Sequence, residues 1–218
     1  MRDIHCHILP GVDDGSPDLE HSLAMLSAAR EAGATSIVCT PHCRDPYFDY
    51  DRMLAAFEVL RSAASSFPLY MGFEVNHSKL MQLGVDEWAP RLGCRRTGQF
   101  LLELDTHFTT DSMGEYERTI YKLQGLGWRV VIAHPERYDA VRKDPELARR
   151  FLQLDCDLQA SADFIRGGRL GNSGKTAKRL FQMGLYRFIA SDAHTAEHYA
   201  LWRQACAEYH VRPSHMHR

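Results

Sequence analysis

The sequence predicts an α/β protein whose parallel strands close into a distorted (β/α)7 barrel. Seven short runs rich in β-forming residues are spaced along the chain, and stretches with helical spacing lie between them. No change in composition marks a linker, and no internal repeat divides the 218 residues. We therefore expect residues 1–218 to form a single domain. A doubly wound open sheet is the alternative architecture for the same pattern.

The expected strands are short apolar runs, and most of them stop at a polar residue followed by a turn. The runs cover residues 2–6, 35–40, 69–74, 100–103, 128–133, 157–159 and 187–191.

The expected helices fill the intervals between the strands. The first begins at Ser16-Pro17, a favourable N-cap followed by proline at the first helical position, and ends near Gly33. The region 76–97 is irregular apart from a short helix at 79–83. Further helices are expected over residues 50–65, 113–126, 145–154, 174–184 and 196–209.

Composition excludes several classes of protein. The formal net charge of −2 gives no sign of a nucleic-acid-binding surface. No apolar run approaches the ~20 residues of a membrane-spanning helix, so we expect no membrane insertion. The first residues are unlike a signal peptide, and the six cysteines include no C-x-x-C pair, which is typical of free thiols in a reducing compartment. We therefore expect a cytoplasmic protein; the sequence sets no oligomeric state.

Residue types that bind metals gather where the expected strands end. His5 and His7 are two apart, so on an extended strand both rings face the same side. In parallel α/β barrels the active site is assembled from the C-terminal ends of the strands. Because the residues are imidazoles and carboxylates without cysteine, we expect a multinuclear site for Mn, Fe or Zn. Six of the seven runs end this way, in His5/His7, His42, Glu74, Glu103, His134 and Asp192/His194.

Five motifs together resemble the polymerase and histidinol phosphatase (PHP) superfamily. They are HCHILPGVDDG at 5–15, TPH at 40–42, GFE at 72–74, HPER at 134–137 and SDAH at 191–194. Within the superfamily they look like the CpsB/CapC-type bacterial protein-tyrosine phosphatases, and the resemblance runs nearly end to end. It implies a distorted (β/α)7 barrel in which a metal-activated hydroxide hydrolyses phosphotyrosine. It also implies a partner, a bacterial tyrosine kinase that controls capsule or exopolysaccharide synthesis.

The same resemblance implies three divalent metal ions, most commonly manganese. Asp13 remains an alternative to its neighbour Asp14, because adjacent aspartates are not separated by sequence. The implied ligands are His5, His7, Glu74 and Asp192 for one ion, Glu74, Glu103 and His134 for a second, and Asp14, His42 and His194 for the third.

Three residues are expected to act on the substrate. Arg137 follows His134 directly and is expected to bind the phosphate with its guanidinium; the alternative is a surface ion pair with Glu136. Either His42 or His194 is expected to protonate the tyrosine leaving group.

The chain departs from the family pattern at two places. Cys43 stands where the family often has a second histidine. The arginine that the family usually carries shortly after the SDAH motif is absent, and His198 is the candidate to replace it at the phosphate.

Two lookalike motifs are set aside. Cys206 and Arg212 match the C-x5-R spacing of thiol-based tyrosine phosphatases, but the segment has no glycine and continues a helix. Gly174-Lys175-Thr176 fails the P-loop pattern, because its first glycine would fall at Arg169. Outside the motifs, His21, His77 and His107 are expected to be solvated.

Three functions follow from these observations. The first is a metal-dependent protein-tyrosine phosphatase. The second is a phosphatase of a small ester such as histidinol phosphate, or a phosphodiesterase. The third is a weakly active metal-binding partner of a kinase, which the departures from the family pattern would explain.

Overall fold

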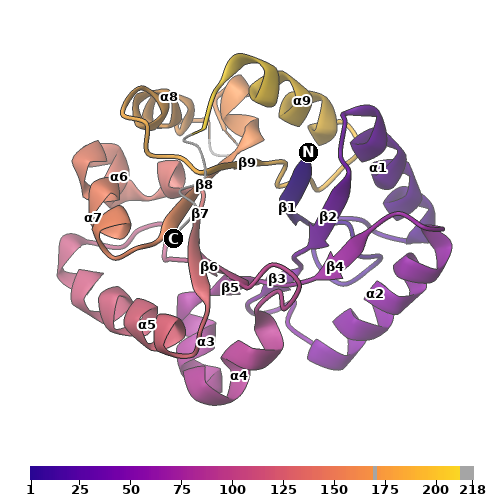
Figure 1. The fold of residues 1–218 in the computed structure, drawn as a ribbon, viewed down its shortest axis with the longest axis horizontal. Coiled ribbons are helices and arrows are strands. Elements are labelled where there is room, and N and C mark those ends of the chain that lie inside the picture. Colours follow the sequence, from indigo (N-terminus) through magenta and orange to yellow (C-terminus); the bar gives the residue numbers. More distant parts are fainter. Residues whose placement is uncertain (169–170, 212–218) are drawn as a thin grey trace, which may run out of the picture.

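In the computed structural model, which describes residues 1–168 and 171–211, parallel strands form a central ring surrounded by helices (Figure 1). Every strand pair is parallel, and the strands follow the orders β1-β2-β4 and β3-β5-β6-β7-β8-β9 in two connected sheets. The strands are β1 (Arg2–Cys6), β2 (Ser36–Cys39), β3 (His42–Cys43), β4 (Leu69–Met71), β5 (Glu74–Asn76), β6 (Gln99–Glu103), β7 (Arg129–Ala133), β8 (Asp157–Ser161) and β9 (Phe188–Ala190).

The ring is closed where the first strand meets the last. Cys6 forms a parallel bridge to Ala193, just beyond β9. The buried carboxylate of Asp3 accepts hydrogen bonds from the backbone N–H and the hydroxyl of Ser191, at 3.0 and 2.6 Å. The expected barrel is confirmed, and the open-sheet alternative is wrong.

Two of the expected strands differ from the observed ones. The run at 35–40 forms β2, and a further short strand, β3, follows it after Pro41, which has no N–H to donate to a ladder. The run at 69–74 becomes β4 and β5, separated by Gly72 and Phe73. Glu74 therefore begins β5 instead of ending a strand. Because β5 continues the direction of β4, Glu74 still lies near the C-terminal edge of the barrel.

Helices cover the outside of the ring (Figure 1). Short 3-10 turns precede several of them, namely η1 (Thr110–Ser112), η2 (Pro135–Arg137), η3 (Pro145–Leu147) and η4 (Ala162–Arg166). The helices are α1 (Leu19–Glu31), α2 (Tyr50–Ala63), α3 (His77–Leu83), α4 (Val85–Leu92), α5 (Met113–Gly125), α6 (Asp139–Lys143), α7 (Ala148–Gln153), α8 (Gly174–Gln182) and α9 (His198–Glu208). None in the described part of the chain is long and apolar enough to cross a membrane.

The helices differ from expectation at several places. The region 76–97, expected to be irregular apart from one short helix, contains α3 and α4, and α6 was not expected. Asp18, not Ser16, caps α1, because its carboxylate accepts the backbone N–H of His21 at 2.9 Å. The helix expected at 145–154 is divided into η3 and α7, which Asp144 starts by accepting the N–H of Glu146 at 3.1 Å.

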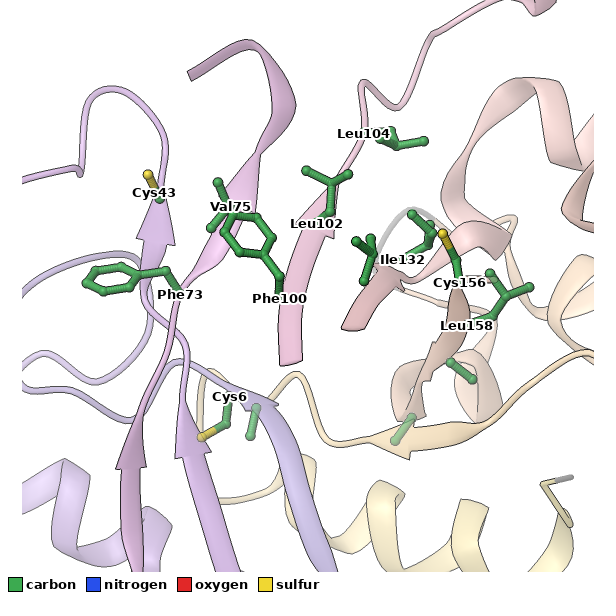
Figure 2. Packing of buried hydrophobic residues seen from close by; sticks show 14 of the residues in the cluster. Cys6, Cys43, Phe73, Val75, Phe100, Leu102, Leu104, Ile132, Cys156 and Leu158 are labelled. Atoms are coloured by element: carbon green, nitrogen blue, oxygen red, sulfur yellow. The ribbon is translucent and has the colours of Figure 1, made fainter. Parts of the chain in front are cut away.

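Alternation along the strands separates an inner from an outer core. On β6, Leu101 faces the small cluster inside the ring, whereas Phe100 and Leu102 face the helices. Figure 2 shows the outer layer, in which Leu102 lies near Val75, and both are fully buried. Burial of one such side chain contributes about 1.5–3 kcal/mol. The apolar packing thus fixes the strands whose ends carry the polar site.

Candidate metal centre

The nine ligands predicted from sequence converge at the C-terminal ends of the strands. Their ligand atoms form four overlapping groups, within each of which all ligand atoms lie within 4.8 Å of one another. His5 and His7 are fully buried beneath a cavity of about 260 Å³. The cavity is lined by His42, Arg44, Glu74, Glu103, Thr106, His134, Arg137, Asp192 and His194.

The innermost donors are spaced as atoms that share one ion. The Nε2 atoms of His5 and His7 are 3.3 Å apart, and both lie 3.3–3.4 Å from Oδ1 of Asp192. Oxygens of Glu74 lie 3.5 and 3.4 Å from the same two nitrogens. Atoms bound to one ion at ~2.1 Å are about 3.0–3.4 Å apart, slightly more than a usual hydrogen bond. These four residues therefore fit a bound divalent cation.

Glu74 is the carboxylate around which the histidines gather. Its Oε1 lies 2.7 Å from Nε2 of His134, and its Oε2 lies 2.6 Å from Nδ1 of His42. Burial raises the pKa of Glu74, but the neighbouring imidazoles outweigh it and hold that pKa well below its usual value. Glu103 completes this side, 3.9 Å from the ring of His134. A carboxylate in contact with rings on several sides can bridge two ions.

The third group is at the rim of the cavity. Oδ1 of Asp14 lies 3.1 Å from Nε2 of His42 and 3.4 Å from Nε2 of His194. Burial acts against ionisation, yet hydrogen bonds to these two rings lower the pKa of Asp14. The two adjacent aspartates thus have separate positions, because Asp13 lies behind His7 and belongs to none of the four groups.

Partners that orient the inner imidazoles were not predicted from sequence. Asp13 Oδ2 lies 2.9 Å from Nδ1 of His7, and the side-chain oxygen of Gln159 lies 3.0 Å from Nδ1 of His5. Such contacts fix which ring nitrogen faces the cavity. Gln159 comes from β8, whose run carries no predicted ligand; a buried polar residue at that strand end was the available signal.

Local backbone conformation turns two predicted ligands into the site. His134 has φ 29° and Asp192 has φ 48°, both in the left-handed region that non-glycine residues rarely adopt. The loop after β1 also folds back closely, since a Cβ on Gly15 would lie 2.1 Å from the carbonyl oxygen of His7. Glycine is therefore required at position 15, so that the loop can carry the aspartates across the cavity.

Arg137 lines the cavity and holds one of its carboxylates. Its Nη2 donates to Ser161 Oγ at 3.0 Å, to Asp163 Oδ2 at 3.1 Å, and to Asp192 Oδ2. Burial opposes the charge, but Asp192 and Asp163 raise the pKa of Arg137 above its usual value. The guanidinium thus fixes the direction of Asp192.

The alternative for Arg137, a surface ion pair with Glu136, is wrong. Glu136 is fully buried and accepts the backbone N–H of Ser161 and the hydroxyl of Tyr186, each at 2.8 Å. These two bonds connect η2 to the end of β8 and to Tyr186, which lies just before β9.

Residues at the two departures from the family pattern lie outside the cavity lining. Cys43 packs in the outer core, as Figure 2 shows. His198 does not line the cavity; its Nδ1 accepts the backbone N–H of His194 at 3.2 Å. The cavity instead contains Arg44, which sequence reasoning missed, although its position two residues after His42 on an alternating segment was a signal.

The remaining sequence expectations have mixed outcomes. The side chains of His21 and His107 are exposed as expected, but His77 is buried, because α3 packs its ring against Tyr116. Burial raises the pKa of the Cys206 thiol to about 11, which disfavours a thiolate nucleophile. Arg212 and Arg169 lie outside the described residues.

Residues 1–214 match the model of a protein family described as capsular polysaccharide synthesis, CpsB/CapC. The tyrosine-protein phosphatase YwqE of Bacillus subtilis is 33% identical over 211 residues, which cover 90% of this chain and 78% of the relative. The tyrosine-protein phosphatase CpsB of Streptococcus pneumoniae is 28% identical over 210 residues, with 90% and 84% covered.

Solved structures give the same assignment of the fold. One structure, from work on YwqE of B. subtilis and CpsB of S. pneumoniae described as unique metal-dependent tyrosine phosphatases, matches with a TM-score of 0.76 and 26% identity. The match covers 95% of this chain and 87% of the other. Dihydropteroate synthase of Yersinia pestis, at a TM-score of 0.52 and 12% identity over 94% of this chain and 92% of its own, shares the fold alone.

Proposed function

Because the chain belongs to the CpsB/CapC family of capsular polysaccharide synthesis proteins, we propose that it is a metal-dependent tyrosine-protein phosphatase. The observation that carries the proposal is the cluster of nine histidine and carboxylate ligands at one cavity, with inner donor atoms 3.3–3.5 Å apart. Metal-dependent tyrosine phosphatases with the same fold support it.

The proposed centre holds three divalent ions, with manganese first and iron or zinc as alternatives. All the donors are imidazole nitrogens and carboxylate oxygens, which suit these metals. Glu74 would be shared by two ions, since its oxygens face different histidines. Following the family resemblance, the ion ligands would be His5, His7, Glu74 and Asp192; Glu74, Glu103 and His134; and Asp14, His42 and His194. The four groups of close ligand atoms contain the same nine residues, but they place Asp192 with His5 and His134, and His7 with Asp14, His42 and His194.

The bound metals would lower the pKa of a water molecule and neutralise charge on the phosphoryl group. The chain's own residues prepare the site for this chemistry. Asp13 and Gln159 hold the inner imidazoles, and Arg137 holds Asp192 while facing the cavity where the phosphate would bind. His194 or His42, which both line the cavity, would give a proton to the leaving tyrosinate in a state in which that ring is not bound to the third ion.

The substrate we propose is phosphotyrosine on a protein, specifically a bacterial tyrosine kinase that regulates capsule or exopolysaccharide synthesis. A cytoplasmic location is part of the same proposal, in keeping with six free cysteines, of which all but Cys206 are buried. We also propose that residues 1–218 form one domain, since the family match runs over residues 1–214. His198 would contribute to phosphate binding only indirectly, through the backbone of His194.

The test is a substrate panel on manganese-loaded protein. The panel is p-nitrophenyl phosphate, a phosphotyrosine peptide, a phosphoserine peptide, histidinol phosphate and a phosphodiester, each with and without a chelator. We expect turnover of the phosphotyrosine peptide that the chelator abolishes. Turnover insensitive to the chelator would refute the metal mechanism.

The two alternative functions are outcomes of the same panel. Preference for histidinol phosphate or for the diester would replace the protein-phosphatase proposal with a small-substrate enzyme. Metal binding without turnover of any ester would favour a kinase-binding protein that has lost activity.

A further inference from the structure

Arg44 lies beside the proposed metal site, in a position that the proposed mechanism does not use. It follows β3 directly, where alternation places His42 in the cavity and Cys43 in the outer core. The next residue along the chain, Arg44, again faces the cavity. Arg44 and Arg137 are the cationic residues among those lining the cavity in the described chain.

The two guanidinium groups differ in how they are satisfied. Arg137 directs Nη2 to Asp192, Asp163 and Ser161. Arg44 forms no ion pair with a carboxylate within 4.0 Å in residues 1–168 and 171–211, although its positive charge acts to lower the pKa of Glu103. Its buried Nε, like that of Arg137, has no hydrogen-bond acceptor there, so the two groups differ at Nη2. Its Nη2 lies 2.9 Å from Nε2 of His42. A partly buried charge with so few acceptors is costly unless an anion binds to it.

The neighbouring aromatic ring holds this guanidinium in place. The ring of Tyr47 stacks on His42 with 5.7 Å between centroids, and Cζ of Arg44 lies 5.8 Å from the Tyr47 centroid. The backbone N–H of Tyr47 also donates to the carbonyl of Arg44 at 3.0 Å. Arg44 is therefore positioned before any ligand arrives.

Metal binding by His42 would free the Nη2 group of Arg44. A ring nitrogen whose lone pair binds an ion can no longer accept a hydrogen bond. In that state both Nη2 and Nε of Arg44 would need an acceptor in the cavity, and two donors on one guanidinium match two oxygens of a phosphoryl group.

We propose that Arg44 binds the phosphoryl group of the substrate. The proposal rests on the proposed function for the identity of the anion. Inorganic phosphate serves as the probe in the experiment, so binding to Arg44 can be measured separately from turnover.

The experiment compares wild-type protein with Arg44→Ala, Arg44→Lys and the control Arg61→Ala. Arg61 is an exposed arginine of α2 that pairs with Glu58 and is absent from the cavity lining. All proteins are loaded with manganese, their metal content is measured by mass spectrometry, and inorganic phosphate is titrated calorimetrically. KM and kcat for p-nitrophenyl phosphate are measured on the same samples.

We expect Arg44→Ala to weaken phosphate binding and raise KM by about 10- to 100-fold, the loss typical of a charged hydrogen-bonding group. Metal content should stay at the wild-type level. The phosphate affinity of Arg44→Lys should lie between those of Arg44→Ala and the wild type, because lysine keeps the charge but loses the paired N–H donors of the guanidinium. Arg61→Ala should match the wild type.

Phosphate Kd and KM within twofold of wild type in Arg44→Ala would overturn the proposal. If Arg44→Ala loses metal, the test of phosphate binding passes to Arg44→Lys. Unchanged phosphate binding in Arg44→Lys, or loss of metal from it, counts against the proposal. A wild type that hydrolyses no ester but binds phosphate through Arg44 would overturn the proposed function and support this inference. A wild type that hydrolyses phosphotyrosine, together with unchanged phosphate binding in Arg44→Ala, would support the proposed function and overturn this inference.

Discussion

Replacing Asp13 with asparagine tests whether a residue that touches no predicted ion controls the metal site. The Asp13 carboxylate meets N–H groups at both oxygens. Oδ2 lies 2.9 Å from Nδ1 of His7 and accepts the backbone N–H of His42 at 3.1 Å, whereas Oδ1 accepts the backbone N–H of Gly15 at 3.0 Å. Asparagine has one oxygen, so either orientation of its amide sets an NH₂ group against an N–H donor.

The expected size of the effect follows from these contacts. A hydrogen bond to a charged group contributes about 1.5–3 kcal/mol. If the metal-binding tautomer of His7 loses that stabilisation, metal affinity falls by about 10- to 100-fold, the range found when partners of metal-binding histidines are removed. We therefore expect Asp13→Asn to weaken manganese binding by about 10- to 100-fold and to lower activity at limiting metal. Asp14→Asn should be more severe, because it alters a proposed ligand.

Calorimetric titration of metal-free protein with manganese measures the effect on binding, and p-nitrophenyl phosphate turnover at increasing manganese measures it on activity. The matched control is Asp51→Asn, an exposed aspartate in the first turn of α2. Manganese affinity of Asp13→Asn within twofold of the wild type would refute the assignment of Asp13 as the residue that orients His7. A complete loss equal to that of Asp14→Asn would instead make Asp13 a ligand.

Three further variants test other parts of the structure. Glu74→Ala should lose bound metal and turnover together, because its oxygens face four imidazoles; metal analysis showing a full complement of ions would contradict this. Cys206→Ser should keep its p-nitrophenyl phosphate activity, since the raised pKa makes the thiol a poor nucleophile, and an inactive variant would revive thiol chemistry. Burial lowers the pKa of His77 below 6.5, so the unfolded state takes up the proton first and wild-type stability falls as pH drops through 6.5. Denaturant unfolding from pH 8 to 5 should show this loss relative to His77→Gln, and parallel pH profiles would count against it.

The strand ends could be predicted from sequence because two rules act together. Apolar runs locate the strands, and in a parallel barrel every strand end points to the same face. His42 and His134 needed no knowledge of side-chain geometry to be placed there. The expected positions of Glu74 and Glu103 hold as well, although Glu74 begins a strand. The break between β4 and β5 makes Glu74 the first residue of a strand, but it leaves the side chain at the same edge of the barrel.

The residues that support the ligands could not be predicted in the same way. Asp13 and Asp14 are adjacent, and their different roles depend on how the loop folds back at Gly15. Gln159 contacts His5 only because ring closure brings β8 close to β1, with β9 alone between them, a relation that no local pattern contains. His77 was expected in solvent because it lies in a loop or on a helix outside the motifs, and its burial depends on packing against α5.

The closed ring and the metal site are not independent features of this chain. Asp3 bonds to Ser191 across 188 residues of sequence, and Asp192 donates its backbone N–H to the carbonyl of His5 at 2.8 Å. These contacts bring a ligand of the first strand against a ligand that follows the last. In an open sheet with β1 and β9 apart, His5 and Asp192 could not lie 3.4 Å from each other. The pattern of ligands at the strand ends was therefore already an argument for closure, because a site that needs both residues requires the two strands to meet.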